Sequence, residues 1–378
     1  MGTIKRTFAN SLTGTGKLSA TNLDSNIPAA NIADASVTNV SALSPSLGSA
    51  IPSVASDPPS PTLGDIWYNS STGKLKNYGF AVAAWASGGN INTSRSQLGG
   101  AGTKSAGLVF GGSVTNSTAP SATNGQKTEL YDGTSWSEVN DKSTHTRQQC
   151  GFGTQTAAVS FGGYSDGAAY QNGSEEFDGT NWTSGGNYPV PISNGAGGST
   201  GTQTAGLNAA GYASYSANTN LTAEYDGTSW TAGGNLPYSA QNTTNFGTQT
   251  AAVSMGGNLD PGISTTTAEY NGSSWTAVNN MLVPAQQNGR VGTQTDGMIF
   301  GGYLTSAYQA GSYLYDGTDW SSNPASLSTA RGNGGPSTSQ GSIGGAFMAG
   351  GDVAETTTYT ATEEFTAAAA AVKTVTTS

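Results

Sequence analysis

A sequence repeat of 45 to 51 residues is the feature that most constrains the fold of this chain. Its first element is Gly-Thr-Gln-Thr, or a variant of it, followed by a small apolar run that ends in glycine. Six copies occur, at residues 102–112, 153–163, 201–211, 247–257, 292–302 and 341–351. A chain with such a period must be interpreted repeat by repeat, because a missed repeat misassigns the whole fold.

A second element follows each of the first five copies. It consists of an aromatic residue, Asp-Gly or Asn-Gly, two small or polar residues and a tryptophan, at residues 131–136, 177–182, 225–230, 270–275 and 315–320. Asp-Gly and Asn-Gly tolerate positive φ and indicate a tight hairpin, and Gly-Thr-Gln-Thr indicates another turn. We therefore expect four short strands per repeat, at a period within the range of propeller blades.

The sixth copy lacks its tryptophan, because the chain continues from Phe365 into an alanine run. Trp85-Ala-Ser-Gly-Gly-Asn, ahead of the first copy, matches the segments at 182–187 and 230–235. We predict that the Trp85 segment pairs beside the stretch ending at Phe365 and closes six repeats into a ring. An open array would leave unpaired edge strands at both of its ends.

These features resemble the kelch family of β-propellers. The double glycine, the aromatic residue before a turn, the tryptophan opening the fourth strand, Gly-Gly-Asn-Leu-Pro at 233–237 and the arginines Arg95, Arg147 and Arg331 carry the resemblance. The third copy departs from the pattern with Ala209-Ala210-Gly211, and three repeats lack the arginine, so the form is degenerate. The resemblance implies an all-β, six-bladed kelch-like propeller over residues 80–366, closed by an N-terminal strand.

Three further segments flank the repeats. Residues 1–56 are rich in Ser, Thr, Asn and Ala, and we expect an extended assembly arm that orders against a partner. We expect residues 57–79 to form a small hairpin module and residues 367–378 to form a C-terminal tail. The Gly-Asp-Ile-Trp-Tyr-Asn run at 64–69 resembles elements of fibre and other virion proteins of tailed bacteriophages. Its union with a kelch-like propeller resembles structural proteins of marine phages.

Charge and apolar content exclude several partners. The chain has 13 Lys and Arg against 23 Asp and Glu, a formal charge of -10, so nucleic acid and anionic membrane surfaces are not expected partners. The apolar stretches at 80–86 and 367–372 are too short to span a bilayer. No secretory signal is expected, because the first basic residues precede no apolar run. Cys150 is the single cysteine, which excludes an internal disulfide.

Catalytic and metal chemistry find little support in the sequence. His145 and Cys150 alone cannot supply a zinc or copper cluster, and we expect no cofactor and no metal. Glu175 and Glu176 are neighbours in a strand and point to opposite faces, so they are no glycosidase pair. Turn chemistry explains the hairpin aspartates better than calcium does. We expect four arginines to fix the ends of the blades by hydrogen bonds to backbone carbonyls: Arg95, Arg147, Arg290 and Arg331. The alternative is that some of them converge in an arginine cluster like that of a sialidase.

The repeat tryptophans and the loop tyrosines receive different predictions. We expect the tryptophans to pack between blades, each worth ~3 to 5 kcal/mol on truncation: Trp85, Trp136, Trp182, Trp230, Trp275 and Trp320. The repeated turns lie at one end of the sheets, and the variable second-to-third loops lie at the other. Their tyrosines are the candidate binding residues: Tyr164, Tyr170, Tyr212, Tyr215, Tyr238, Tyr303 and Tyr308.

Together these features favour a non-enzymatic virion protein, a tail fibre or receptor-binding adhesin that recognises a host-surface glycan or protein. Its arm would bind other virion proteins, as a homo-oligomer made in the host cytoplasm. The alternative is a capsid or filament decoration protein that protects or spaces an assembly. An enzyme acting on surface glycans is the third possibility.

Overall fold

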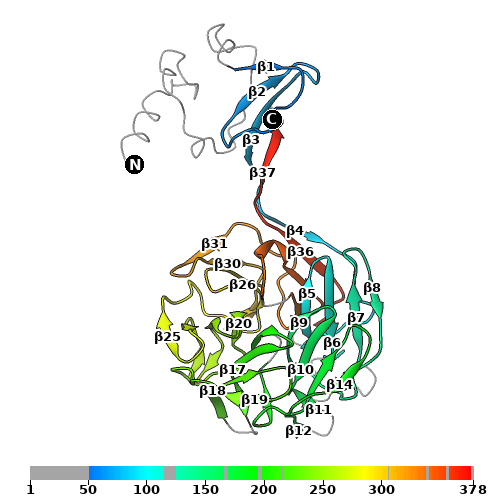
Figure 1. The fold of residues 1–378 in the computed structure, drawn as a ribbon, viewed down its shortest axis with the longest axis vertical. Helices are drawn as coiled ribbons and strands as arrows, with labels where there is room; N and C mark the ends of the chain where they lie inside the picture. Colours follow the sequence, from blue (N-terminus) through cyan, green and yellow to red (C-terminus); the bar gives the residue numbers. More distant parts are fainter. Residues whose placement is uncertain are drawn as a thin grey trace. The chain divides into compact units, whose positions relative to one another are not determined.

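The computed structural model describes residues 51–114, 125–165, 169–194, 198–213, 217–304, 306–337, 340–354 and 357–375. The chain divides into two compact units, Ala83–Ala367 and a smaller unit of Met1–Val82 with Ala368–Ser378. In the described residues, both units are built from β-strands (Figure 1). The helical structure in the described ranges is one 3-10 turn, η4 (Ile343–Gly345), and no helix there has the length and hydropathy needed to cross a membrane.

The described strands of the larger unit form six antiparallel sheets of four or five strands, one for each sequence repeat, and four two-stranded hairpins. We number these sheets 1 to 6 in the order of the repeats. Sheet 1 consists of β5 (Gly99–Thr103), β6 (Ala106–Phe110), β7 (Thr128–Tyr131) and β8 (Trp136–Glu138). Sheet 2 consists of β9 (Cys150–Thr154), β10 (Ala157–Phe161), β13 (Ser174–Phe177) and β14 (Trp182–Ser184). Sheet 3 consists of β16 (Ser199–Thr202), β17 (Ala205–Ala213), β18 (Ala217–Tyr225) and β19 (Trp230–Ala232), and β15 (Ile192–Ser193) also pairs with β17.

Sheets 4 and 5 repeat the same order, and sheet 6 takes its fourth strand from the beginning of the unit. Sheet 4 consists of β20 (Thr244–Thr248), β21 (Ala251–Met255), β24 (Thr267–Tyr270) and β25 (Trp275–Val278). Sheet 5 consists of β26 (Gly289–Thr293), β27 (Asp296–Phe300), β30 (Ser312–Tyr315) and β31 (Trp320–Asn323). Sheet 6 consists of β32 (Gly335–Pro336), β33 (Phe347–Ala349), β36 (Thr362–Thr366) and β4 (Ala84–Ser87).

The pairing of β4 with β36 confirms the predicted position of the Trp85 segment. Trp85 lies directly opposite Phe365, and the two ring centroids are 5.3 Å apart. The first strands also contact one another in a closed cycle, because β32 contacts both β26 and β5. The remaining contacts of the cycle join β5 to β9, β9 to β16, β16 to β20 and β20 to β26. In Figure 1 these first strands lie toward the middle of the unit, with β8, β14 and β25 toward its rim.

A chain of backbone hydrogen bonds runs along the same cycle. It joins residues that stand two positions before a first strand and have left-handed backbones, with φ between 53° and 59°: Gln97, Gln148, Asn242, Gln287 and Asn333. Four of these N–H groups donate to the carbonyl of the residue before them in the cycle: Gln148 to Gln97 at 3.1 Å, Gln97 to Asn333 at 2.7 Å, Asn333 to Gln287 at 3.2 Å and Gln287 to Asn242 at 3.4 Å. The bond from Gln97 to Asn333 joins sheet 1 to sheet 6. The equivalent position of the third repeat lies outside the described residues.

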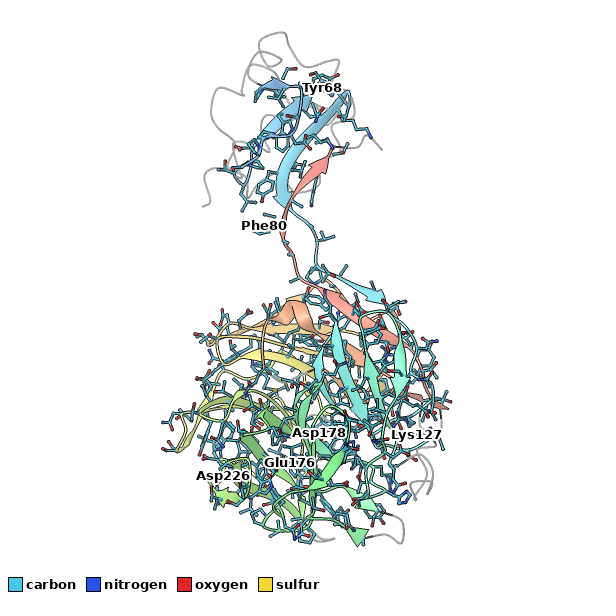
Figure 2. The ribbon with its side chains drawn as sticks, turned by 45° about the vertical axis from the view of Figure 1, so that its right-hand side comes forward. Tyr68, Phe80, Lys127, Glu176, Asp178 and Asp226 are labelled. Atoms are coloured by element: carbon cyan, nitrogen blue, oxygen red, sulfur yellow. The ribbon has the colours of Figure 1, made fainter. Side chains whose placement is uncertain are left out.

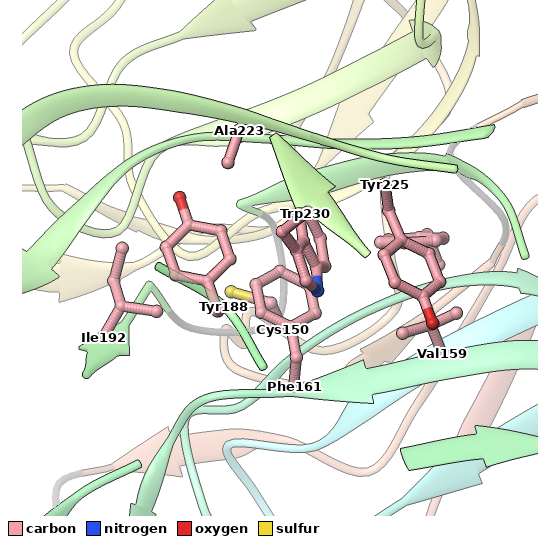
Figure 3. Close-up of a cluster of buried hydrophobic side chains, with 9 residues drawn as sticks. Cys150, Val159, Phe161, Tyr188, Ile192, Ala223, Tyr225 and Trp230 are labelled. Atoms are coloured by element: carbon pink, nitrogen blue, oxygen red, sulfur yellow. The ribbon is translucent and has the colours of Figure 1, made fainter. Parts of the chain in front are cut away.

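Each repeat tryptophan reaches the sheet that precedes its own. Its indole N–H donates to a serine or threonine hydroxyl of that sheet's third strand, at 2.9 to 3.2 Å. The pairs are Trp85 with Ser312, Trp136 with Thr362, Trp182 with Thr128, Trp230 with Ser174, Trp275 with Thr222 and Trp320 with Thr267. Figure 3 shows the position of Trp230 in the apolar cluster between sheets 2 and 3.

The aromatic residue at or next to the end of each third strand makes a second contact with the preceding sheet. Four are tyrosines whose hydroxyls donate to a glutamate: Tyr131 to Glu364, Tyr225 to Glu176, Tyr270 to Glu224 and Tyr315 to Glu269. The other two are Phe177 and Phe365, and a leucine replaces the glutamate opposite each, Leu130 and Leu314. Each pair of neighbouring sheets, including sheets 1 and 6, therefore has one of two combinations: tyrosine with glutamate or phenylalanine with leucine. Glu176 is labelled in Figure 2.

The glutamine of Gly-Thr-Gln-Thr makes a third contact of this kind. Its amide N–H groups donate to two carbonyls of the preceding sheet, as Gln155 does to Gly107 at 3.0 Å and Tyr131 at 2.7 Å. Gln203, Gln249 and Gln294 repeat the arrangement. In the first repeat Lys104 replaces the glutamine, and its ammonium donates to the carbonyl of Phe365 at 2.8 Å. The sequence pattern predicted only a turn for Gly-Thr-Gln-Thr, whereas this segment also joins adjacent sheets.

Glycines in the strands give room to aromatic rings of neighbouring sheets. A Cβ on Gly206 would lie 2.1 Å from Cζ of Phe152, and one on Gly297 would lie 2.2 Å from Cζ of Phe246. Because such separations are sterically forbidden, only glycine permits these rings to pack flat against the next sheet. The high glycine content thus serves close packing as well as turns.

The smaller unit contains one four-stranded sheet. Its strands are β1 (Ser53–Val54), β2 (Ile66–Asn69), β3 (Lys74–Phe80) and β37 (Ala370–Thr374), hydrogen-bonded in that order. Buried Trp67 donates its indole N–H to Asp57 Oδ1 at 2.9 Å, and Asn69 donates to the same oxygen at 2.8 Å. The sequence analysis expected a hairpin and a separate tail. The structure instead pairs part of that tail with β3, since the tail's alanine-valine run offers an apolar strand.

We predict that the tyrosine–glutamate contact between sheets 1 and 6 can be exchanged for the apolar pair. Tyr131→Phe should lower the free energy of unfolding by ~1–3 kcal/mol, because the half-buried carboxylate of Glu364 loses its hydrogen-bond donor. Adding Glu364→Leu should recover most of that loss, since Phe177 and Leu130 form the same pair between sheets 1 and 2. Urea unfolding of the two single variants and the double variant measures the coupling. Strictly additive effects would contradict the contact.

We also predict a loss of stability at high pH. Burial, followed by the bond to a glutamate, raises the pKa of Tyr131 and of Tyr270 from 10.0 to about 12. A tyrosine with a raised folded-state pKa stabilises the fold fully below the unfolded pKa and loses that contribution as pH rises. Unfolding free energy should therefore fall between pH 10 and about 12. Tyr131→Phe should show a smaller fall over this window, and an unchanged slope would be inconsistent with the assignment.

Candidate functional site

The two ends of the six sheets have different structures. At one end, the turns between third and fourth strands are closed by a side chain that accepts backbone N–H groups. Asp132 Oδ1 accepts from Thr134 and Ser135, both at 2.8 Å, and Asn271 does the same in the fourth repeat. These bonds lower the pKa of Asp132, Asp178, Asp226 and Asp316. The carboxylates are therefore engaged in the turns, as the sequence indicated.

The opposite end carries hairpins that differ from sheet to sheet, and we call it the hairpin face. Four two-stranded hairpins join second to third strands, and in sheet 3 the strands β17 and β18 themselves extend into this region. The hairpins are β11 (Tyr164–Ser165) with β12 (Ala169–Tyr170), β22 (Asn258–Leu259) with β23 (Gly262–Ile263), β28 (Tyr303–Leu304) with β29 (Ala307–Tyr308), and β34 (Asp352–Ala354) with β35 (Thr357–Thr358).

Three of the predicted binding tyrosines form a continuous row on the hairpin face. Tyr164 and Tyr170 lie opposite each other across their hairpin with ring centroids 5.2 Å apart, and Tyr170 lies 5.8 Å from Tyr212 of sheet 3. The guanidinium of Arg147 lies 4.8 Å from the centre of the Tyr164 ring and donates to Gln97 Oε1 at 2.9 Å. All three rings are half-buried. We call Tyr164, Tyr170 and Tyr212 the tyrosine row.

The other predicted tyrosines have different environments. Tyr303 and Tyr308 repeat the cross-strand ring contact in sheet 5, at 5.2 Å. Tyr238 packs against the apolar cluster of sheets 3 and 4 and donates to the carbonyl of Ser254 at 3.2 Å, and burial raises its pKa to about 12. This position makes Tyr238 part of the packing between sheets. Tyr215 lies outside the described residues.

A groove adjoins the end of the tyrosine row. It has a volume of about 720 Å³ and lies between the hairpin regions of sheets 3 and 4. Tyr212 lines it from sheet 3, together with Asn218, Gln241, Asn258, Asp260 and Pro261. Asn218 Nδ2 donates to the carbonyl of Asn258 at 2.9 Å and so joins its two walls. Of these residues the sequence analysis named only Tyr212, because the groove forms between two repeats.

The buried cations have structural partners. Arg95 donates to the carbonyls of Gly111 and Lys127 and pairs with Glu129 at 2.6 Å. Arg331 pairs with Glu363 at 3.0 Å in the same way. The carbonyl bonds were expected from the sequence and the glutamates were not, although glutamate occurs at that third-strand position in the three repeats that Arg95, Lys142 and Arg331 precede.

The other cations and acids follow separate patterns. Lys142 lies 4.0 Å from Glu175, and burial lowers the lysine pKa to about 8 while the carboxylate opposes that shift. Arg290 is fully buried and donates to the carbonyls of Gly151 and Ser199, in sheets 2 and 3. The arginines considered as a sialidase-like cluster thus have four different sets of partners. Glu175 accepts from Ser143 and Thr144 in the segment between β8 and β9, whereas Glu176 accepts from Tyr225 of sheet 3.

Cys150 and the tryptophans also have positions inside the larger unit. Burial raises the pKa of the Cys150 thiol to about 12, so at neutral pH it is a protonated apolar group. The six repeat tryptophans lie between sheets, as their bonds to the preceding sheet show. Neither the thiol nor the tryptophans belong to the hairpin face. The tyrosine row and the groove beside it are therefore the candidate site.

Comparison with known proteins extends the description of the fold. No protein-family model and no curated protein sequence matches this chain. The solved structure of YjhT is similar, with a TM-score of 0.60 over 75% of this chain and 99% of the YjhT chain. The two sequences are 11% identical over the match. The likeness therefore establishes a shared fold for most of the chain.

Proposed function

We propose that residues Ala83–Ala367 form a six-bladed, kelch-like β-propeller. Six sheets that follow the six sequence repeats support this assignment, as does the cycle of contacts among their first strands. Three kinds of inter-sheet contact also join sheet 1 to sheet 6: the Trp136 bond to Thr362, the Tyr131 bond to Glu364 and the Lys104 bond to the Phe365 carbonyl.

We further propose that the chain is a non-enzymatic virion protein of a tailed phage, a tail fibre or adhesin that recognises a host surface. The observation that carries this proposal is the tyrosine row. Its aromatic rings are half-exposed on the hairpin face, whereas the tryptophans and the third-strand tyrosines are used between sheets. Half-exposed aromatic residues on variable loops above a rigid scaffold are typical of recognition surfaces.

The smaller unit supports an assembly role. Of the six large apolar side chains that are exposed among the described residues, five belong to it: Leu63, Tyr68, Phe80, Val82 and Val372. Phe80 is 58% exposed and Val82 76% exposed; Phe80 and Tyr68 are labelled in Figure 2. Exposed apolar residues gathered in one small unit favour contact with other chains. We propose that this unit, with residues 1–56 as its assembly arm, joins the protein to other virion proteins, as a homo-oligomer on the particle surface.

The proposed function predicts that the purified chain binds the bacterial cells infected by the particle that contains it. Tyr164→Ser combined with Tyr170→Ser should weaken cell binding about tenfold or more, because it removes two aromatic anchors from the hairpin face. Asp226→Asn is the matched control, since Asn271 occupies the equivalent turn position naturally. Flow cytometry with labelled protein measures the binding.

Three outcomes would contradict the proposal. Absence of cell binding by the unmodified chain, with antibody labelling of the capsid on intact particles, would favour a decoration protein. Release of sugar from cell surfaces would indicate an enzyme. Equal cell binding by the double variant and the unmodified chain would show that the tyrosine row is not the recognition surface.

A further inference from the structure

We infer that the groove between sheets 3 and 4 binds a neutral oligosaccharide, with the tyrosine row as an extended platform that leads into it. This inference rests on the proposed function and names the class of ligand that the hairpin face would recognise.

The size and continuity of the site suit an extended ligand. The groove volume of about 720 Å³ is within the ~300–1,000 Å³ range of small-molecule sites. Tyr212 lines the groove and also contacts Tyr170, so the aromatic surface continues from the groove onto the hairpin of sheet 2. A single small ligand would occupy only the groove, whereas a chain of rings would use the whole length.

The chemistry of the lining suits sugar rings. A pyranose presents an apolar C–H face, which packs on an aromatic ring, and an edge of hydroxyl groups, which need donors and acceptors. Tyr212 offers the aromatic face, and the amides of Asn218, Gln241 and Asn258 offer both donors and acceptors. Asp260 is exposed at the rim and adds a carboxylate acceptor. Few side chains of this kind pack well against a purely apolar ligand.

Charge selects neutral sugars over acidic ones. Among the described residues that line the groove, Asp260 is the charged group, and no basic side chain faces it there. The chain as a whole carries a formal charge of -10. A sialylated or sulfated glycan would therefore approach a site of its own sign, which costs affinity and steers it away. Arg147 lies at the far end of the row, engaged with Tyr164 and Gln97.

The test uses the full chain on an array of neutral and sialylated glycans, followed by calorimetry on the neutral glycan bound best. Tyr212→Ala should weaken the binding of that glycan about tenfold, because it removes the aromatic ring that joins the tyrosine row to the groove. Tyr68→Ala is the control, because Tyr68 is an exposed tyrosine of the smaller unit and does not line the groove. The control should stay within about twofold of the unmodified chain.

A second variant keeps the inference testable if Tyr212→Ala unfolds. Asp260→Asn changes an exposed residue and should raise binding of sialylated glycans relative to neutral ones, since it removes the repulsive carboxylate. An unchanged preference, or a loss in Tyr68→Ala as great as that in Tyr212→Ala, would overturn the inference. Cell binding without binding to any neutral glycan would also overturn it while leaving the proposed function intact. Absence of both kinds of binding would contradict both proposals.

Discussion

Each sheet of the larger unit is fixed by side chains that reach the sheet before it in the sequence. The tryptophan, the third-strand tyrosine or phenylalanine and the turn glutamine all act in that one direction. This directionality leaves the first sheet without a predecessor unless the sixth provides one. Trp136 and Tyr131 find their partners at Thr362 and Glu364, so the contacts that join neighbours also require closure.

The same constraint explains why the two ends of the sheets differ. Glutamines and Asx turns occupy the end where the first and second strands meet. The glutamines donate to backbone carbonyls and the Asx side chains accept from backbone N–H groups, and these bonds leave little freedom for sequence change. The hairpins at the other end contribute less to contacts between sheets. They can therefore differ in length and side chains while the sheets keep their register, and the tyrosine row and the groove both occur there.

Much of this arrangement could be predicted from local patterns in the sequence. The Asp-Gly turns, the strand order and the pairing of Trp85 with Phe365 followed from motif and period. The exchange of tyrosine–glutamate for phenylalanine–leucine was missed, because it depends on which strand faces which across 46 or more residues. The groove was missed for a related reason, since Asn218 and Asp260 converge only through packing of two repeats. Pairing of β37 with β3 joins residues from opposite ends of the chain, where no repeat offered a template.

Amide hydrogen exchange across β4 tests the closure most directly. The account predicts that the amides of β4 that bond to β36 exchange as slowly as those of β14, a fourth strand whose partner is its immediate neighbour in sequence. Exchange of the β4 amides at the rate of an unpaired segment, with β14 still protected, would contradict closure of the six sheets by the Trp85 strand.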